Sequence, residues 1–110
     1  MTHMQHEISL AVRILATIKC HKKGNPILSA EIEAMYSISG SKLRDLIRIF
    51  RRQGETIANN GGETEGYFYA ETWAEYESTY RDLVGRGKSL LETASLSVRR
   101  FKIEDTLFAL

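Results

Sequence analysis

The chain has 110 residues, of which 43% are hydrophobic and 26% charged, with a net charge of +1, one proline and one cysteine. This length predicts one compact domain, and the ordinary composition excludes disordered, collagen-like and low-complexity proteins. The longest apolar runs, 67–70 and 107–110, are too short to span a bilayer, and the lone Cys20 excludes a disulfide framework, so we expect a cytoplasmic protein with no membrane segment.

The first predicted helix lies between His6 and Cys20. Apolar residues at Ile8, Ala11, Leu15 and Ile18 have the 3–4 spacing of one helix face, and Val12 and Ile14 widen it. Glycine and proline within residues 22–26 end this helix. Residues 27–28 are predicted as a short extended piece.

Two more helices are predicted at residues 30–36 and 42–53, with a tight turn at residues 37–40 between them. Ser29 is the expected N-cap of the shorter helix. Its expected inward residues are Ile32, Met35 and Tyr36. The longer helix is capped by Ser39 or Ser41 and ended by Gly54. Its inward stripe, at the spacing of a helix face, consists of Leu43, Leu46, Ile47 and Phe50.

A β-hairpin and a long helix complete the chain. Two runs of β-forming residues, 55–59 and 67–70, flank a glycine-rich segment that contains Asn60-Gly61, a typical hairpin turn. Thr72 is the expected cap of a helix that begins at Trp73. Apolar, aromatic or small residues recur along it, largely at 3–4 spacing, at Trp73, Tyr76, Tyr80, Leu83, Gly87, Leu90, Ala94 and Phe101, flanked by Val84, Leu91 and Val98. Tyr76 and Tyr80 are expected to face inward or an interface. Gly85 and Gly87 leave open whether this is one helix or two.

Charge is unevenly distributed along the chain. Residues 19–52 contain eight lysines and arginines against three acids, whereas residues 53–85 contain seven acids against one arginine. Such asymmetry within a small domain indicates a basic face that binds an anion. The alternative is that the two segments pair with each other in the fold.

The order helix, short strand, helix, turn, helix, hairpin, long helix resembles a winged helix-turn-helix. The resemblance is carried by the helix-turn-helix LSAEIEAMYSISGSKLRDLIRIFRRQG and by the hairpin, or wing, ETIANNGGETEGYFYA. It implies a mainly α fold with a small β-hairpin (α+β), divided into a winged domain at residues 1–71 and a helical extension at residues 72–110 within one compact unit. The plan is most similar to small phage- or prophage-encoded regulators and replication proteins.

This resemblance implies a sequence-specific protein that binds double-stranded DNA. In such folds the second helix of the pair enters the major groove. Arginine can bind guanine through two hydrogen bonds, and lysine or serine can reach phosphates and bases. The predicted DNA-binding residues are Ser41, Lys42, Arg44, Arg48, Arg51 and Arg52, the last two at phosphates. The competing interpretation is a solvated face on which Asp45 pairs with Arg48.

The wing and the last helix suggest further partners. Glu63 and Glu65 at the wing tip would repel phosphate, so the alternative function is a winged-helix module that binds a host replication or transcription protein without reading DNA. The apolar stripe of the last helix either folds back on the first helix or pairs with its copy, and we expect a homodimer.

No motif indicates an enzyme, a metal or a cofactor. His3, His6 and His21 are scattered, the first two in an N-terminal stretch expected to be mobile, and no cluster of cysteines or carboxylates completes a metal site. Cys20 and His21 are adjacent in the sequence. Because consecutive side chains on a helix point apart, we do not expect them to form a catalytic Cys–His pair. We therefore expect a non-enzymatic binding protein without cofactors.

Overall fold

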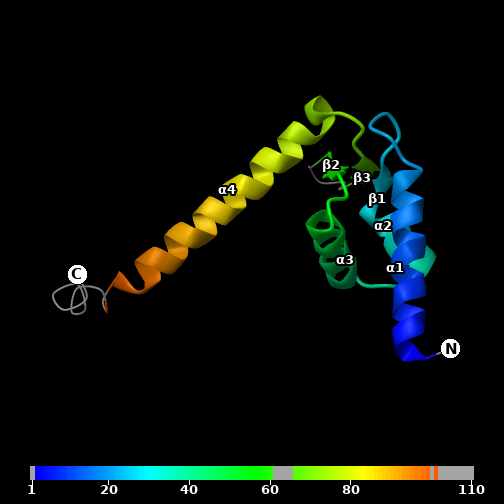
Figure 1. The fold of residues 1–110 in the computed structure, drawn as a ribbon, viewed down its shortest axis with the longest axis horizontal. Coiled ribbons are helices and arrows are strands. Elements are labelled where there is room, and N and C mark those ends of the chain that lie inside the picture. Colours follow the sequence, from blue (N-terminus) through cyan, green and yellow to red (C-terminus); the bar gives the residue numbers. More distant parts are fainter. Residues whose placement is uncertain (1, 61–65, 100, 102–110) are drawn as a thin grey trace. The chain divides into compact units, whose positions relative to one another are not determined.

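The computed structural model describes residues 2–60, 66–99 and 101. Over these residues the fold is mainly helical with a small antiparallel sheet, and the predicted α+β class is confirmed. The elements are α1 (His3–Lys19), β1 (Ile27–Leu28), α2 (Ser29–Tyr36), α3 (Gly40–Arg52), β2 (Ile57–Asn59), β3 (Gly66–Tyr69) and α4 (Trp73–Ser97) (Figure 1). The chain divides into two compact units, residues 1–79 and 80–110, with the boundary inside α4.

Three short strands of the N-terminal unit form one antiparallel sheet in the order β1-β3-β2. Strands β2 and β3 are the predicted hairpin, with Ile57 opposite Tyr69 and Asn59 opposite Tyr67. Strand β1 pairs with the other edge of β3, where Ile27 lies opposite Tyr67. The sequence did not predict this pairing because a strand of two residues is too short to show alternation.

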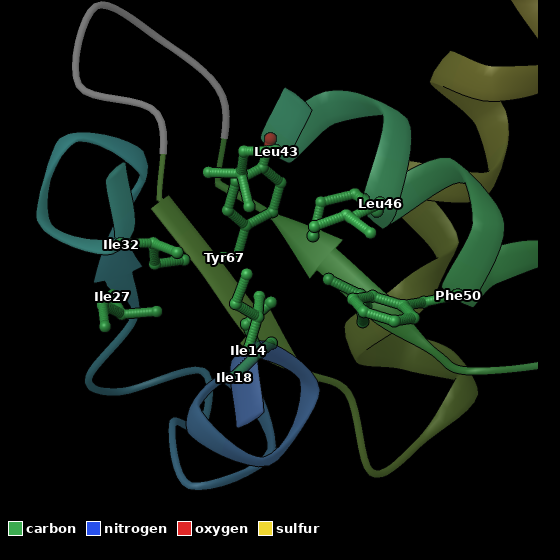
Figure 2. Close-up of a cluster of buried hydrophobic side chains, with 10 residues drawn as sticks. Ile14, Ile18, Ile27, Ile32, Leu43, Leu46, Phe50 and Tyr67 are labelled. Atoms are coloured by element: carbon green, nitrogen blue, oxygen red, sulfur yellow. The ribbon is translucent and has the colours of Figure 1, made fainter. Parts of the chain in front are cut away.

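An apolar core lies between the sheet and helices α1, α2 and α3 (Figure 2). Tyr67 of β3, only 2% exposed, belongs to it together with residues of all three helices. Every residue of the predicted α3 stripe is at most 8% exposed, so that prediction is confirmed. The buried members of this core are Ile14, Ile18, Ile27, Ile32, Leu43, Leu46, Ile47, Phe50, Ile57 and Tyr67.

A second, smaller cluster covers the other face of the hairpin. Because neighbouring residues of a strand point to opposite faces, Phe68 lies on the face away from Tyr67, where it is buried with Ala58 and Ala70. Tyr76 of α4 packs against this cluster. Thr79 is 3% exposed, and its Oγ1 accepts a hydrogen bond of 3.2 Å from the Asn59 N–H. These contacts bind the first turns of α4 into the N-terminal unit.

Helix α1 begins earlier than predicted. Thr2 caps it by accepting a hydrogen bond from the Gln5 N–H, and the Gln5 side chain accepts one from the Thr2 N–H. His3 and His6, which the sequence placed in a mobile N-terminal stretch, both belong to this helix. The buried face centres on Ile14 and Ile18. Ile8 is 59% exposed because the core contacts α1 only from Leu10 onward, and Val12 is 61% exposed because it lies outside the helix face that meets the core.

Helix α2 differs from prediction at its start and on one face. Ser29 is its first residue rather than its cap, and the Ser29 hydroxyl donates a hydrogen bond of 2.9 Å to Glu33. Ile32 is buried and Tyr36 half-buried as predicted, but Met35 is 58% exposed. The inward assignment of Met35 is wrong because this helix of only two turns meets the core along a narrower face.

Helix α4 runs without interruption through Gly85 and Gly87. Trp73 and Tyr80 are 57% and 48% exposed, so neither belongs to the core, and an interfacial role of Tyr80 stays a prediction. The helix meets the hairpin through Tyr76 and Thr79 instead. Within the described residues, no helix combines the length and the apolar character needed to cross a bilayer.

Candidate nucleic-acid interface

A three-residue turn joins α2 to α3 and sets where α3 begins. Ser37 ends α2 in the left-handed conformation, with φ of 53°, and the Ile38 N–H donates a hydrogen bond of 3.1 Å to the Glu33 carbonyl. The Ser39 hydroxyl then caps α3 by accepting a hydrogen bond of 3.1 Å from the Lys42 N–H. Of the two predicted caps, Ser39 is therefore the one used.

Opposite its buried stripe, α3 carries an exposed polar ridge. Four of the predicted DNA-binding residues share this face, and we call them the outer ridge: Ser41, Arg44, Arg48 and Arg52, all exposed. Asp45 lies on the same face, with its Oδ1 3.5 Å from Arg48 Nη2 and both side chains more than 60% exposed. Such exposed pairs contribute at most about 1 kcal/mol, so Arg48 can exchange Asp45 for another acceptor. The solvated pair weighed as an alternative is present, and it leaves the arginine accessible.

Lys42 stands at the side of the outer ridge and is paired with α1. Its Nζ lies 2.7 Å from Glu7 Oε2, and the two side chains are 42% and 37% exposed. The hydrogen bond and positive charge of Lys42 lower the pKa of the Glu7 carboxyl. No sequence pattern could have indicated this contact, because the partners are 35 residues apart and on different helices.

Arg51 is turned toward the sheet instead of the outer ridge. It is half-buried, and its Nε donates a hydrogen bond of 2.9 Å to the Ile57 carbonyl of β2. This bond ties the C-terminal turn of α3 to the hairpin. A phosphate contact by Arg51 remains a prediction, and it would have to be compatible with that bond.

The basic and acidic segments of the chain do pair, at the end of α1. Lys19 lies 3.3 Å from Glu55 and Lys22 lies 3.0 Å from Glu71. Both ammonium groups also lie within 6 Å of the Tyr69 ring centre, at 5.4 and 5.7 Å. Over the described residues, the outer ridge forms no ion pair with an acid of residues 53–85. The charge asymmetry thus has two parts, one neutralised within the fold and one left on α3.

Tyr69 forms two hydrogen bonds in the region where these lysines and acids pair. The Tyr69 hydroxyl donates a hydrogen bond of 2.7 Å to Glu55, and the backbone N–H of Tyr69 donates one of 2.8 Å to the His21 carbonyl. The Tyr69 hydrogen bond, followed by Lys19, lowers the pKa of Glu55. These lysines are therefore part of the contact between α1 and the hairpin.

The wing tip lies outside the described residues, including Glu63 and Glu65. At its base, Asn60 Oδ1 accepts a hydrogen bond of 2.8 Å from the Gly66 N–H, and the Asn60 N–H donates one of 3.1 Å to the Gly66 carbonyl. These two bonds close the hairpin at the point where its strands end.

The part of α4 in the second unit exposes apolar residues. Leu90 and Leu91 are 70% and 72% exposed, and Val98 is 39% exposed. We call the face that contains them the α4 stripe: Leu83, Val84, Gly87, Leu90, Leu91 and Ala94 of α4, spaced at the 3–4 intervals of a helix face, together with Val98 one residue past the end of the helix. A row of large exposed apolar residues is typical of a surface that binds another protein segment.

Over the described ranges, no three His, Cys, Asp or Glu side chains gather in a way that could hold a metal ion. Comparison with protein-family models, curated proteins and solved structures gave no match. The function is therefore inferred from the residues and contacts of this chain alone.

Proposed function

We propose that the N-terminal unit is a winged helix-turn-helix that binds double-stranded DNA with α3 in the major groove. Helices α2 and α3, joined by three residues, correspond to the helix-turn-helix. Strands β2 and β3 correspond to the wing, and β1 adds a third strand. The protein then acts as a transcription regulator or a replication factor.

The outer ridge carries this proposal. Its residues extend from Ser41 to Arg52 over about 16 Å of helix, at 1.5 Å per residue. The opposite face of α3 is buried in the core through Leu43, Leu46, Ile47 and Phe50. The core therefore fixes the position of α3, and its cationic face stays accessible. Arg44 and Arg48 share one face and can each form two parallel hydrogen bonds with a guanine. Arg52, at the far end, is placed to meet a phosphate.

The two cations beside the ridge have different roles in this proposal. Lys42, at the start of α3 and paired with the half-buried Glu7 of α1, can reach a phosphate. Arg51 acts as a positioning residue, because its hydrogen bond to the Ile57 carbonyl links the recognition helix to the wing.

We also propose that the α4 stripe joins two copies of the chain. The exposure of Leu90 and Leu91 favours a helix–helix contact between identical chains, and so does the seven-residue interval from Val84 to Leu91, which continues to Val98 just past the end of α4. A two-fold dimer would present two recognition helices to half-sites about 34 Å apart, as dimeric helix-turn-helix proteins do.

The proposed function is tested by selecting fragmented genomic DNA on the purified protein near physiological salt and sequencing what is retained. We expect enrichment of a short site with two-fold symmetry, and an affinity that falls linearly in log K against log salt. Retention without a motif would mean that only the DNA backbone is bound. Absence of retention even at low salt would overturn DNA binding.

The second candidate is a module that binds a host protein through the same fold. It is favoured by the net charge of +1 and by the neutralisation of Lys19 and Lys22 within the chain. This function predicts no affinity for duplex at low salt, together with loss of partner binding on changing Glu63 and Glu65 to glutamine.

A further inference from the structure

Helix α1 places a carboxylate beside the basic face of α3. Glu7 Oε2 accepts a hydrogen bond from Lys42 Nζ at 2.7 Å, a shorter contact than the Lys19–Glu55, Lys22–Glu71 and Asp45–Arg48 ion pairs. Lys42 is in the first turn of α3, next to Ser41 of the outer ridge. The pair therefore lies at the end of α3 that the proposed function places nearest the DNA.

This pair is accessible and can be exchanged. The Lys42 and Glu7 side chains are 42% and 37% exposed, so neither is sealed into the core. Ion pairs that water can reach contribute little net free energy, and a DNA phosphate offers the lysine an oxyanion of the same charge. A phosphate that reached Lys42 would also come close to the Glu7 carboxylate, and the two anions would repel each other.

We propose that Glu7 is a built-in competitor for the DNA backbone: it occupies Lys42 in the free protein and must give the lysine up when a phosphate binds. This inference rests on the proposed DNA binding and adds to it a residue that lowers affinity for duplex of any sequence. The effect is independent of sequence because phosphate contacts carry no base information. A larger share of the discrimination between sites is then left to Arg44 and Arg48.

The test compares Glu7→Gln with Glu71→Gln as a matched control. Both variants remove one negative charge from an exposed lysine pair, but Glu71 pairs with Lys22, away from α3. Binding to a fixed-length duplex of random sequence is measured by fluorescence anisotropy between about 50 and about 200 mM salt. Thermal unfolding of each variant checks that it is folded.

We expect Glu7→Gln to bind about two- to fivefold more tightly than the natural protein, the range that an exposed ion pair supports. The slope of log K against log salt should become steeper by up to about 0.9, one additional phosphate contact. Neither change is expected in Glu71→Gln. In the background of Lys42→Gln, adding Glu7→Gln should have little effect, because the lysine that Glu7 occupies is gone.

Two results would overturn the inference while leaving DNA binding in place. One is an equal increase in duplex affinity in Glu7→Gln and Glu71→Gln. The other is an unchanged or lower duplex affinity in Glu7→Gln. The first would indicate a general effect of net charge. The second would mean that Glu7 only positions α3. Failure of both the natural protein and Glu7→Gln to bind duplex at the lowest salt would overturn the inference together with the proposed function.

Discussion

Helix α3 and the C-terminal part of α4, from Tyr80 to Ser97, both carry apolar residues at the 3–4 spacing of a helix face. In α3 these residues are buried, with Leu43 and Ile47 at 0% and 2% exposure. In α4 the corresponding Leu90 and Leu91 are 70% and 72% exposed. The same periodicity therefore marks a face that is buried in the core in α3 and a face that is exposed in α4.

The polar faces of the two helices differ as well. The outer ridge of α3 carries three arginines and a serine, with Asp45 beside them. The polar positions of α4 beyond Tyr80 carry both signs, with Arg81, Arg86 and Lys88 against Asp82 and Glu92. A face with a clear excess of positive charge suits an anionic ligand, whereas a face with nearly balanced charges suits water. We infer that α3 binds its ligand with its polar side and α4 binds with its apolar side.

The largest effect is expected from truncating the buried stripe. Leu43→Ala should lower the free energy of unfolding by about 2–5 kcal/mol, because it opens a cavity in the core. Leu91→Ala, the same change on the α4 stripe, should alter it by about 0.5 kcal/mol or less at low protein concentration. Urea unfolding at several protein concentrations measures both. An equally large, concentration-independent loss in Leu91→Ala would contradict the exposed position of that residue.

The next effect concerns the two polar faces. Arg44→Ala combined with Arg48→Ala should weaken binding to the selected DNA site about 30-fold or more, since each arginine is expected to contribute about 1–3 kcal/mol. Arg86→Ala combined with Lys88→Ala removes the same charge from α4 and should have a much smaller effect. Fluorescence anisotropy at constant salt compares the variants. Equal losses in the two double variants would mean that net charge alone determines binding.

The α4 stripe can be tested on its own. Leu91→Asp should raise the dissociation constant of the dimer about tenfold or more, because it places a carboxylate in an apolar contact. Leu96→Asp is the matched control: Leu96 is 56% exposed and lies on the opposite side of the helix from Gly87. Analytical ultracentrifugation gives the oligomeric state. A natural protein that stays monomeric at high concentration would disprove dimerisation through α4.

The smallest effect is expected where lysines of the basic segment are already paired. The pKa of Glu55 is lowered by Tyr69 and Lys19, so its charged form stabilises the fold at neutral pH. That stabilisation, below about 1 kcal/mol for a partly exposed pair, should be lost as the pH falls below the ordinary pKa of a glutamate and through the lowered one.

This pH dependence is measured by comparing melting temperatures of the natural protein and Glu55→Gln from neutral to acidic pH. The difference should be greatest at neutral pH and vanish in acid. In Tyr69→Phe, only the part of the pH-dependent stabilisation that comes from the Lys19–Glu55 pair should remain. A difference that persists unchanged in acid would show that the Glu55 charge does not contribute.

Much of the fold was predictable because helices and hairpins are local. The inward stripe of α3 follows from its own spacing, and the hairpin from the glycine-rich turn between two β-forming runs. Gly54, with φ of 91°, follows α3 in the conformation that glycine adopts most easily. Each of these features depends on residues within a few positions of one another.

Other features required the folded chain. The pairing of β1 with β3 joins Ile27 to Tyr67, and nothing in a two-residue strand indicates that partner. Ile8, Met35 and Trp73 are apolar residues at positions that a helix pattern places on an apolar face, yet each is more than half exposed. A hydrophobic pattern describes a face of one element, and burial depends on a second element.

The candidate site divides in the same way. The sequence by itself determined that α3 is an amphipathic helix whose outer ridge contains Ser41, Arg44, Arg48 and Arg52, because their spacing excludes them from the core side. Only the tertiary structure decided that Lys42 pairs with Glu7 and that Arg51 turns to the hairpin. The physical reason is that helical spacing is a property of neighbouring residues, whereas the partner of a charge is whichever group the fold brings within a few ångströms of it.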